Sequence, residues 1–187
     1  MITEALKSIS LRGRIVYAIM CAEKYASTKF PSNAWKLVFK PFWEICESET
    51  WDEWSDKVLE YIPEILLEFD SYESSDFDYL PKSEYEQIRK LFKTTNKNVN
   101  TILYNIRKIE LAYSYSSISG IGKESLDIIE EIVKILEKEK IELPDPQRVA
   151  FSKFSEKNGW GEPFDGKGLS IILKIKNDKL LEQMVLD

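Results

Sequence analysis

WKLVFKPFWEIC, residues 35–46, carries its large apolar side chains at alternating steps of three and one residues. This spacing predicts one face of an α-helix, with a kink at Pro41. The stretch WDEWSDKVLEYIPEILLEF, residues 51–69, has a similar pattern at steps of three and four, with a second proline at position 63. Aromatic side chains at such spacing are usually core anchors. The two stretches therefore predict two helices that pack against a common core.

Apolar residues at helical spacing recur on both sides of these stretches. They predict further helices over about 2–26, between Ser83 and the polar connection at 94–98, and over about 99–117, 123–140 and 177–186. The stripe of 123–140 is so wide that we expect this helix to be central. Residues 169–175, LSIILKI, fit either a short strand or an irregular segment. The chain has no internal repeat and no linker, so we predict an all-α, single-domain bundle of about six to eight helices over residues 1–187.

Composition narrows the function classes. The chain has no histidine, which removes the commonest general base and the commonest zinc ligand. It also lacks a complete phosphate-binding glycine loop, because GIGKES at 120–125 has neither the first glycine nor a preceding strand. We therefore expect no enzyme, no catalytic residues, no cofactor and no metal. Cys21 and Cys46 each stand among apolar residues, which predicts two buried thiols.

The hydropathy pattern bears on localisation. No apolar run approaches the roughly 20 residues that a membrane-spanning helix needs. The N-terminal sequence MITEALKSIS does not resemble a secretory signal. We expect a cytoplasmic protein with no membrane partner.

Acidic residues are concentrated in one part of the chain. Residues 47–86 hold 14 acidic residues and two lysines, a local net charge of −12, whereas the rest of the chain carries +6. The densest part is residues 68–79, which we call the acidic loop, where aromatic side chains alternate with the acids. Acidic surfaces attract basic partners, and aromatic side chains often anchor interfaces. The predicted partner contacts are Glu68, Asp70, Tyr72, Glu73, Asp76, Phe77, Asp78 and Tyr79.

Other interpretations of the acidity stay open. The acidic loop also fits a solvated surface that only aids solubility. A metal site is disfavoured, because DSYESSDFD lacks the turn glycine and the regular alternation of a calcium-binding loop. The helix over 123–140, with Asp127, Glu130 and Glu131, is a competing acidic surface. Lysines and arginines form no concentrated patch, so nucleic acid is not an expected partner.

Two stretches suggest a family. WDEWSDKVLEYIPEILLEFDSYESSDF, residues 51–77, and SEKNGWGEPFDGK, residues 155–167, resemble bacterial immunity proteins of polymorphic-toxin systems, and among these the all-helical immunity protein 6 family. The resemblance extends over most of the chain and implies a cytosolic antidote that binds a cognate toxin. Many such toxins are nucleases with basic substrate-binding surfaces, which an acidic partner can cover. The resemblance supplies no catalytic residues.

Two alternatives belong to other functional classes. The chain also fits a histidine-free enzyme or a small-ligand or metal-binding protein that uses carboxylates in a helical cleft, or a structural or regulatory oligomer. Trp160, which lies between Gly159 and Gly161, fits a structural plug or a partner contact.

Overall fold

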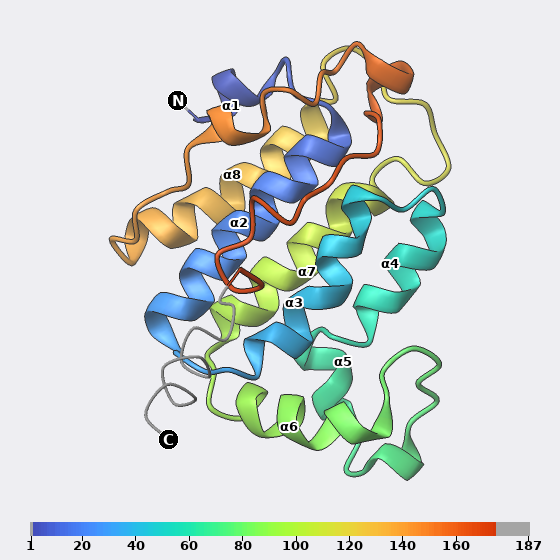
Figure 1. Cartoon of the computed structure of the whole chain (residues 1–187), viewed down its shortest axis with the longest axis vertical. Helices are drawn as coiled ribbons and strands as arrows, with labels where there is room; N and C mark the ends of the chain where they lie inside the picture. Colours follow the sequence, from blue (N-terminus) through green and yellow to red (C-terminus); the bar gives the residue numbers. More distant parts are fainter. Residues whose placement is uncertain (1, 175–187) are drawn as a thin grey trace, which may run out of the picture.

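The computed structural model describes residues 2–174, and within them the chain is an all-α bundle without a β-strand (Figure 1). The predicted bundle of six to eight helices is confirmed. The α-helices of the described part are α1 (Ile2–Leu6), α2 (Leu11–Lys29), α3 (Trp35–Trp43), α4 (Trp51–Leu59), α5 (Pro63–Glu68), α6 (Lys82–Phe92), α7 (Lys97–Leu111) and α8 (Lys123–Lys138).

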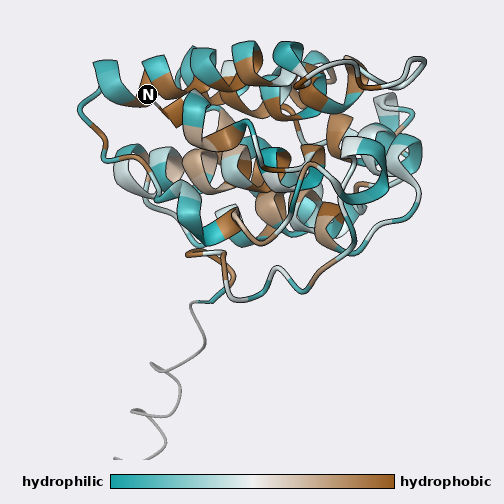
Figure 2. Cartoon of the chain, turned by 90° about the horizontal axis from the view of Figure 1, so that it is seen from above, coloured by the Kyte–Doolittle hydropathy of each residue, from teal (hydrophilic) through white to brown (hydrophobic). Residues whose placement is uncertain are grey.

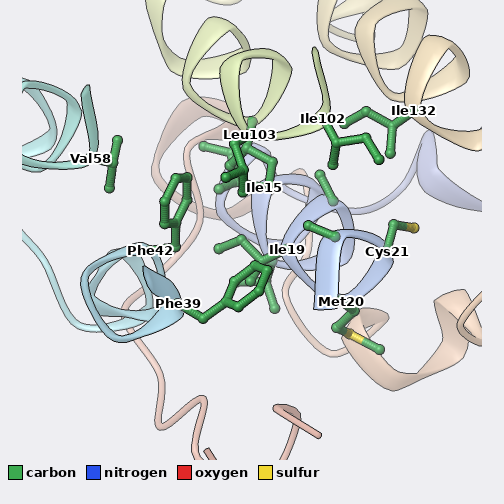
Figure 3. Close-up of a cluster of buried hydrophobic side chains, with 14 of the residues drawn as sticks. Ile15, Ile19, Met20, Cys21, Phe39, Phe42, Val58, Ile102, Leu103 and Ile132 are labelled. Atoms are coloured by element: carbon green, nitrogen blue, oxygen red, sulfur yellow. The ribbon is translucent and has the colours of Figure 1, made fainter. Parts of the chain in front are cut away.

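Helix α2 is the centre of the bundle. It packs against α3, α7 and α8, and the side chains of these four helices together with Val58 of α4 meet in one core (Figure 3). Gly13 lets the segments on either side of the bundle's helices approach α2: a Cβ atom added there would lie only 2.5 Å from the Ile9 side chain, which precedes α2, and 3.2 Å from that of Ser152, which follows α8. The expectation that the helix over 123–140 is central was wrong, because Lys123, Asp127 and Lys134 keep one face of α8 exposed.

Several helix boundaries differ from the prediction. Pro63 does not kink one long helix but begins a new one, α5, because a proline suits the first turn, where no backbone donor is required. The predicted helix over 2–26 is likewise divided into α1 and α2. Helix α7 ends at Leu111, six residues before the predicted end at Ser117.

The predicted core stripe is confirmed. All six residues of the predicted stripe along 35–46 are buried, namely Trp35, Val38, Phe39, Phe42, Trp43 and Cys46, and Pro41 and Ile45 are buried beside them. Figure 2 shows apolar residues on the inner faces of the helices and hydrophilic residues on the outer faces. Both cysteines are buried and free, as predicted, and burial raises the pKa of each thiol to about 12.

Residues 139–174, which follow α8, contain only short 3₁₀ turns and irregular chain, and they cross the outside of the bundle near α2 (Figure 1). Buried polar residues of α2 hold this segment in place: the Arg12 guanidinium donates to the Gly161 carbonyl, and it also donates to the carbonyls of Ile45 and Ser48 after α3. The Glu23 carboxylate accepts hydrogen bonds from Ser170 Oγ at 2.5 Å and from the Ile171 backbone at 2.8 Å. Such bonds offset the cost of burying a charge.

For residues 169–175, the irregular alternative holds over 169–174, which contain turns and bends. Residue 175 and the predicted helix over 177–186 lie outside the described residues. Within residues 2–174 no helix combines the length and the apolar character that crossing a membrane requires.

Candidate functional site

The acidic loop connects α5 to α6 at one end of the bundle (Figure 1). A buried carboxylate holds its last residues: Glu60, only 9% exposed, accepts the backbone N–H groups of Asp78 at 2.8 Å, Tyr79 at 2.8 Å and Leu80 at 2.6 Å. Hydrogen bonds to a charged acceptor are stronger than neutral ones. In the sequence Glu60 is one acid among many, whereas in the structure it anchors the loop.

The aromatic rings of the acidic loop pack against one another. The centroid of Phe77 lies 5.2 Å from that of Phe69, 6.4 Å from that of Tyr72 and 6.1 Å from that of Tyr85 in α6. Tyr72 and Tyr85 lie 5.7 Å apart. The half-buried Tyr72 and Phe77 therefore stabilise the loop itself, and only part of each ring faces outward.

The acidic residues of the loop, in contrast to the aromatic cluster, are all exposed. Glu68, Asp70, Asp76 and Asp78 are exposed, and none of them forms a salt bridge within residues 2–174. Glu73 is also exposed but pairs with Lys82, and that hydrogen bond lowers the pKa of the Glu73 carboxyl. Four of the five predicted carboxylate contacts thus present uncompensated charge to solvent.

The eighth predicted residue, Tyr79, belongs to a second feature. It lines an open groove of about 780 Å³ between the start of α4, the end of α7 and the C-terminal segment. We call this the acidic groove, because one lysine, Lys157, stands among five lining carboxylates: Glu49, Asp52, Glu53, Asp56 and Glu110. Four of the five belong to the acidic segment 47–86 that the sequence singled out.

Aromatic side chains form the walls of the acidic groove. The rings of Trp51 and Trp160 meet edge to face at 4.7 Å, and the Arg12 guanidinium lies 4.8 Å from the centroid of Trp51. The Trp160 carbonyl accepts the Arg12 backbone N–H at 3.0 Å, which fixes its position. Tyr79 forms the link to the acidic loop. Its pKa is raised by desolvation and then by the charges of Glu53 and Asp56.

Glu110 is the unusual residue of the groove. It lies in the last turn of α7 and is only 1% exposed. Its Oε1 accepts a hydrogen bond from Ser114 Oγ at 2.7 Å, but its Oε2 is buried without any partner, one of three such side-chain atoms in the described residues. Leaving a buried acceptor unpaired costs roughly 1–3 kcal/mol. In the sequence Glu110 resembles any helix-surface glutamate, so nothing there indicated its burial.

Bases within the protein compensate only part of the groove's charge. Lys157 lies 3.5 Å from Glu49 and 3.2 Å from Glu162, which is outside the groove. Arg107 lies 3.8 Å from Asp56. Asp52 and Glu110 have no salt bridge among residues 2–174, so the groove retains a negative field.

The competing acidic surface on α8 is different. Asp127 pairs with Lys123 at 2.5 Å, and Glu130 pairs with Lys134 at 2.8 Å, one helical turn away in each case. Glu131 accepts a hydrogen bond from Asn105 at 3.0 Å. The three acids that made α8 a competing surface, Asp127, Glu130 and Glu131, therefore have partners of their own.

Within residues 2–174 no three acidic or sulfur side chains lie close enough together to hold a metal ion. Comparison of the chain with family models, with curated proteins and with solved structures found no match.

Proposed function

We propose that this chain is an immunity protein that binds and neutralises a basic bacterial toxin through the acidic loop and the acidic groove. The observation that carries the proposal is the uncompensated negative charge of these two neighbouring features, which share Tyr79. The resemblance of residues 51–77 and 155–167 to immunity proteins supplies the class of partner.

The proposed mechanism combines attraction and occlusion. An acidic surface accelerates encounters with a basic protein, and the gain falls with ionic strength. Once bound, the loop and groove would cover the basic surface with which a nuclease toxin holds its substrate. This mechanism needs no catalytic group in the antidote, and it acts in the cytoplasm, where the toxin's substrate is found.

The test first searches the genes beside that of this chain for a toxin domain and then expresses the two proteins together. Co-expression should restore growth of cells that carry the toxin, and the purified proteins should form a stable complex. Reversing charge with Asp76→Lys and Asp78→Lys should slow association at least tenfold at low salt and weaken its salt dependence.

A matched control reverses two exposed charges elsewhere, with Glu124→Lys and Glu137→Lys on α8. This variant undergoes the same change in net charge and should associate at nearly the original rate. An unchanged rate for the loop variant would contradict the role of the acidic loop, and failure to restore growth would contradict the proposed function.

A further inference from the structure

The acidic groove contains a buried acceptor that nothing in the described protein satisfies. We infer that this groove binds an arginine side chain of the protein partner, with the guanidinium directed toward Glu110. The inference rests on the proposed function for the source of the arginine, but the chemistry of the groove can be tested without the toxin.

The lining of the groove carries more negative than positive charge. Five carboxylates line the groove against one lysine, and that lysine is shared with Glu162 outside it. Glu110 sharpens this general attraction, because its Oε2 is buried without a hydrogen bond while Ser114 holds Oε1 in place. Buried charges in proteins are normally paired. A cationic donor that enters the groove would supply the missing partner.

The lining of the groove favours a guanidinium over other cations. The described residues do not bring acidic groups together closely enough for a metal ion, which disfavours a divalent cation. The walls are aromatic, and a planar guanidinium stacks on aromatic rings while it donates to carboxylates, as an ammonium group cannot. The protein already places one guanidinium over a ring of this groove, where Arg12 lies 4.8 Å from the Trp51 ring centroid while it donates to backbone carbonyls. Trp160 and Tyr79 are the further aromatic side chains of the groove.

Exposed side chains that follow groove residues in the sequence indicate that the arginine belongs to a protein. Leu111 follows Glu110 in α7 and is exposed, and Tyr115 follows the groove residue Ser114 and is fully exposed. Exposed apolar and aromatic side chains next to a charged groove are typical of a protein interface. A free metabolite would leave these side chains uncovered, whereas an arginine on a protein surface brings neighbouring residues that cover them.

The experiment titrates the full chain with the blocked tripeptides acetyl-Gly-Arg-Gly-amide and acetyl-Gly-Lys-Gly-amide. Binding is followed by NMR through the indole signals of Trp51 and Trp160, at about 150 mM salt, where the Debye length is about 8 Å. We expect saturable shifts of both indoles with the arginine peptide and several-fold weaker binding of the lysine peptide. Glu110→Gln should weaken binding of the arginine peptide about tenfold, since it removes the charge but keeps the shape.

A second variant guards against loss of folding in the first. Asp52 and Glu53 are exposed lining residues, so Asp52→Asn with Glu53→Gln should retain the fold and also weaken binding. The matched control neutralises two exposed acids of α8, with Glu124→Gln and Glu137→Gln, and should leave peptide binding unchanged. Equal binding of the two peptides, or an unchanged affinity in a folded Glu110→Gln variant, would overturn the inference.

These outcomes are independent of the proposed function. If the toxin binds but the arginine peptide does not, only the role of the groove is wrong. If the peptide binds as expected but the toxin does not, the groove chemistry stands and the identity of the partner is wrong.

Discussion

The acidic loop and the acidic groove both combine acidic with aromatic side chains, but these side chains are arranged differently in the two. In the loop, the acids are contiguous in sequence, most of its rings pack against one another, and the carboxylates point into solvent. In the groove, the acids come from separate segments, aromatic rings form the walls, and one carboxylate is buried without a full set of partners. Solvent can satisfy the loop, whereas the groove has an unmet hydrogen-bonding need. Charge density in sequence therefore locates an attractive surface, but only the fold reveals a specific subsite.

The largest predicted effect removes the anchor of the loop. Glu60→Ala leaves three backbone donors of the loop without their carboxylate, and we expect it to lower the free energy of unfolding by about 3 kcal/mol. Urea denaturation measures the loss, and hydrogen exchange at Asp78, Tyr79 and Leu80 localises it. The control Glu68→Ala removes an exposed acid with no such bonds and should change stability little. Equal stability of the two variants would contradict the anchoring role of Glu60.

The next prediction separates the two aromatic clusters. Phe77→Ala should lower the free energy of unfolding by about 2 kcal/mol, because the half-buried ring contacts Phe69, Tyr72 and Tyr85. It should leave binding of the arginine peptide intact. Trp160→Ala should instead weaken binding of the arginine peptide, because it removes one aromatic wall of the groove. Thermal denaturation and peptide titration of both variants test this, and loss of peptide binding in Phe77→Ala would show that the two features are not separable.

A smaller effect is expected from charge repulsion. Neutralising two exposed loop acids with Asp76→Asn and Asp78→Asn should raise the free energy of unfolding by about 0.5 kcal/mol at low salt, because like charges repel. The gain should disappear at about 1 M salt, where the Debye length is only about 3 Å. Denaturation curves at both salt concentrations provide the measurement. A gain that persists at high salt would indicate a cause other than charge.

The smallest predicted effect is a change in the pKa of Tyr79, the residue that the loop and the groove share. Desolvation and the charges of Glu53 and Asp56 raise the pKa of Tyr79, because burial and nearby anions both disfavour the phenolate. Glu53→Gln with Asp56→Asn should therefore lower the pKa of Tyr79 toward its ordinary value. The pKa can be followed by NMR with labelled tyrosine, and Tyr79→Phe identifies the signal. An unchanged pKa would place Tyr79 outside the field of the groove.

The sequence predicted the features that depend on local periodicity. The stripe from Trp35 to Cys46 identified a core face, because helical spacing alone places those residues together. The central position of α2 was missed, because Arg12, Arg14 and Glu23 give it the appearance of a surface helix, while their burial depends on bonds to distant segments. The sequence could not show that Pro63 separates two helices rather than kinking one.

In the candidate site, too, the sequence predicted local features but not the contacts between distant segments. Exposure of the loop acids followed from their density and from the break in helical pattern. Glu110 could not be identified, since its burial depends on how the end of α7 packs. Trp160 was left between two interpretations, and its contact with Trp51, more than 100 residues earlier, makes it a wall of the groove. Sites assembled from distant segments leave little local signal.

The residues that line the groove are far apart in the sequence, so a ribosome synthesises them at different times. The residues of the loop and its aromatic cluster end at Tyr85, but the groove needs Trp160, about 75 residues later. At roughly 5–20 residues per second, a ribosome takes about 4–15 s to synthesise that interval. During this time a nascent chain contains the acids of the loop but not the finished subsite. Selective, arginine-dependent recognition would therefore begin only after Trp160 has been synthesised.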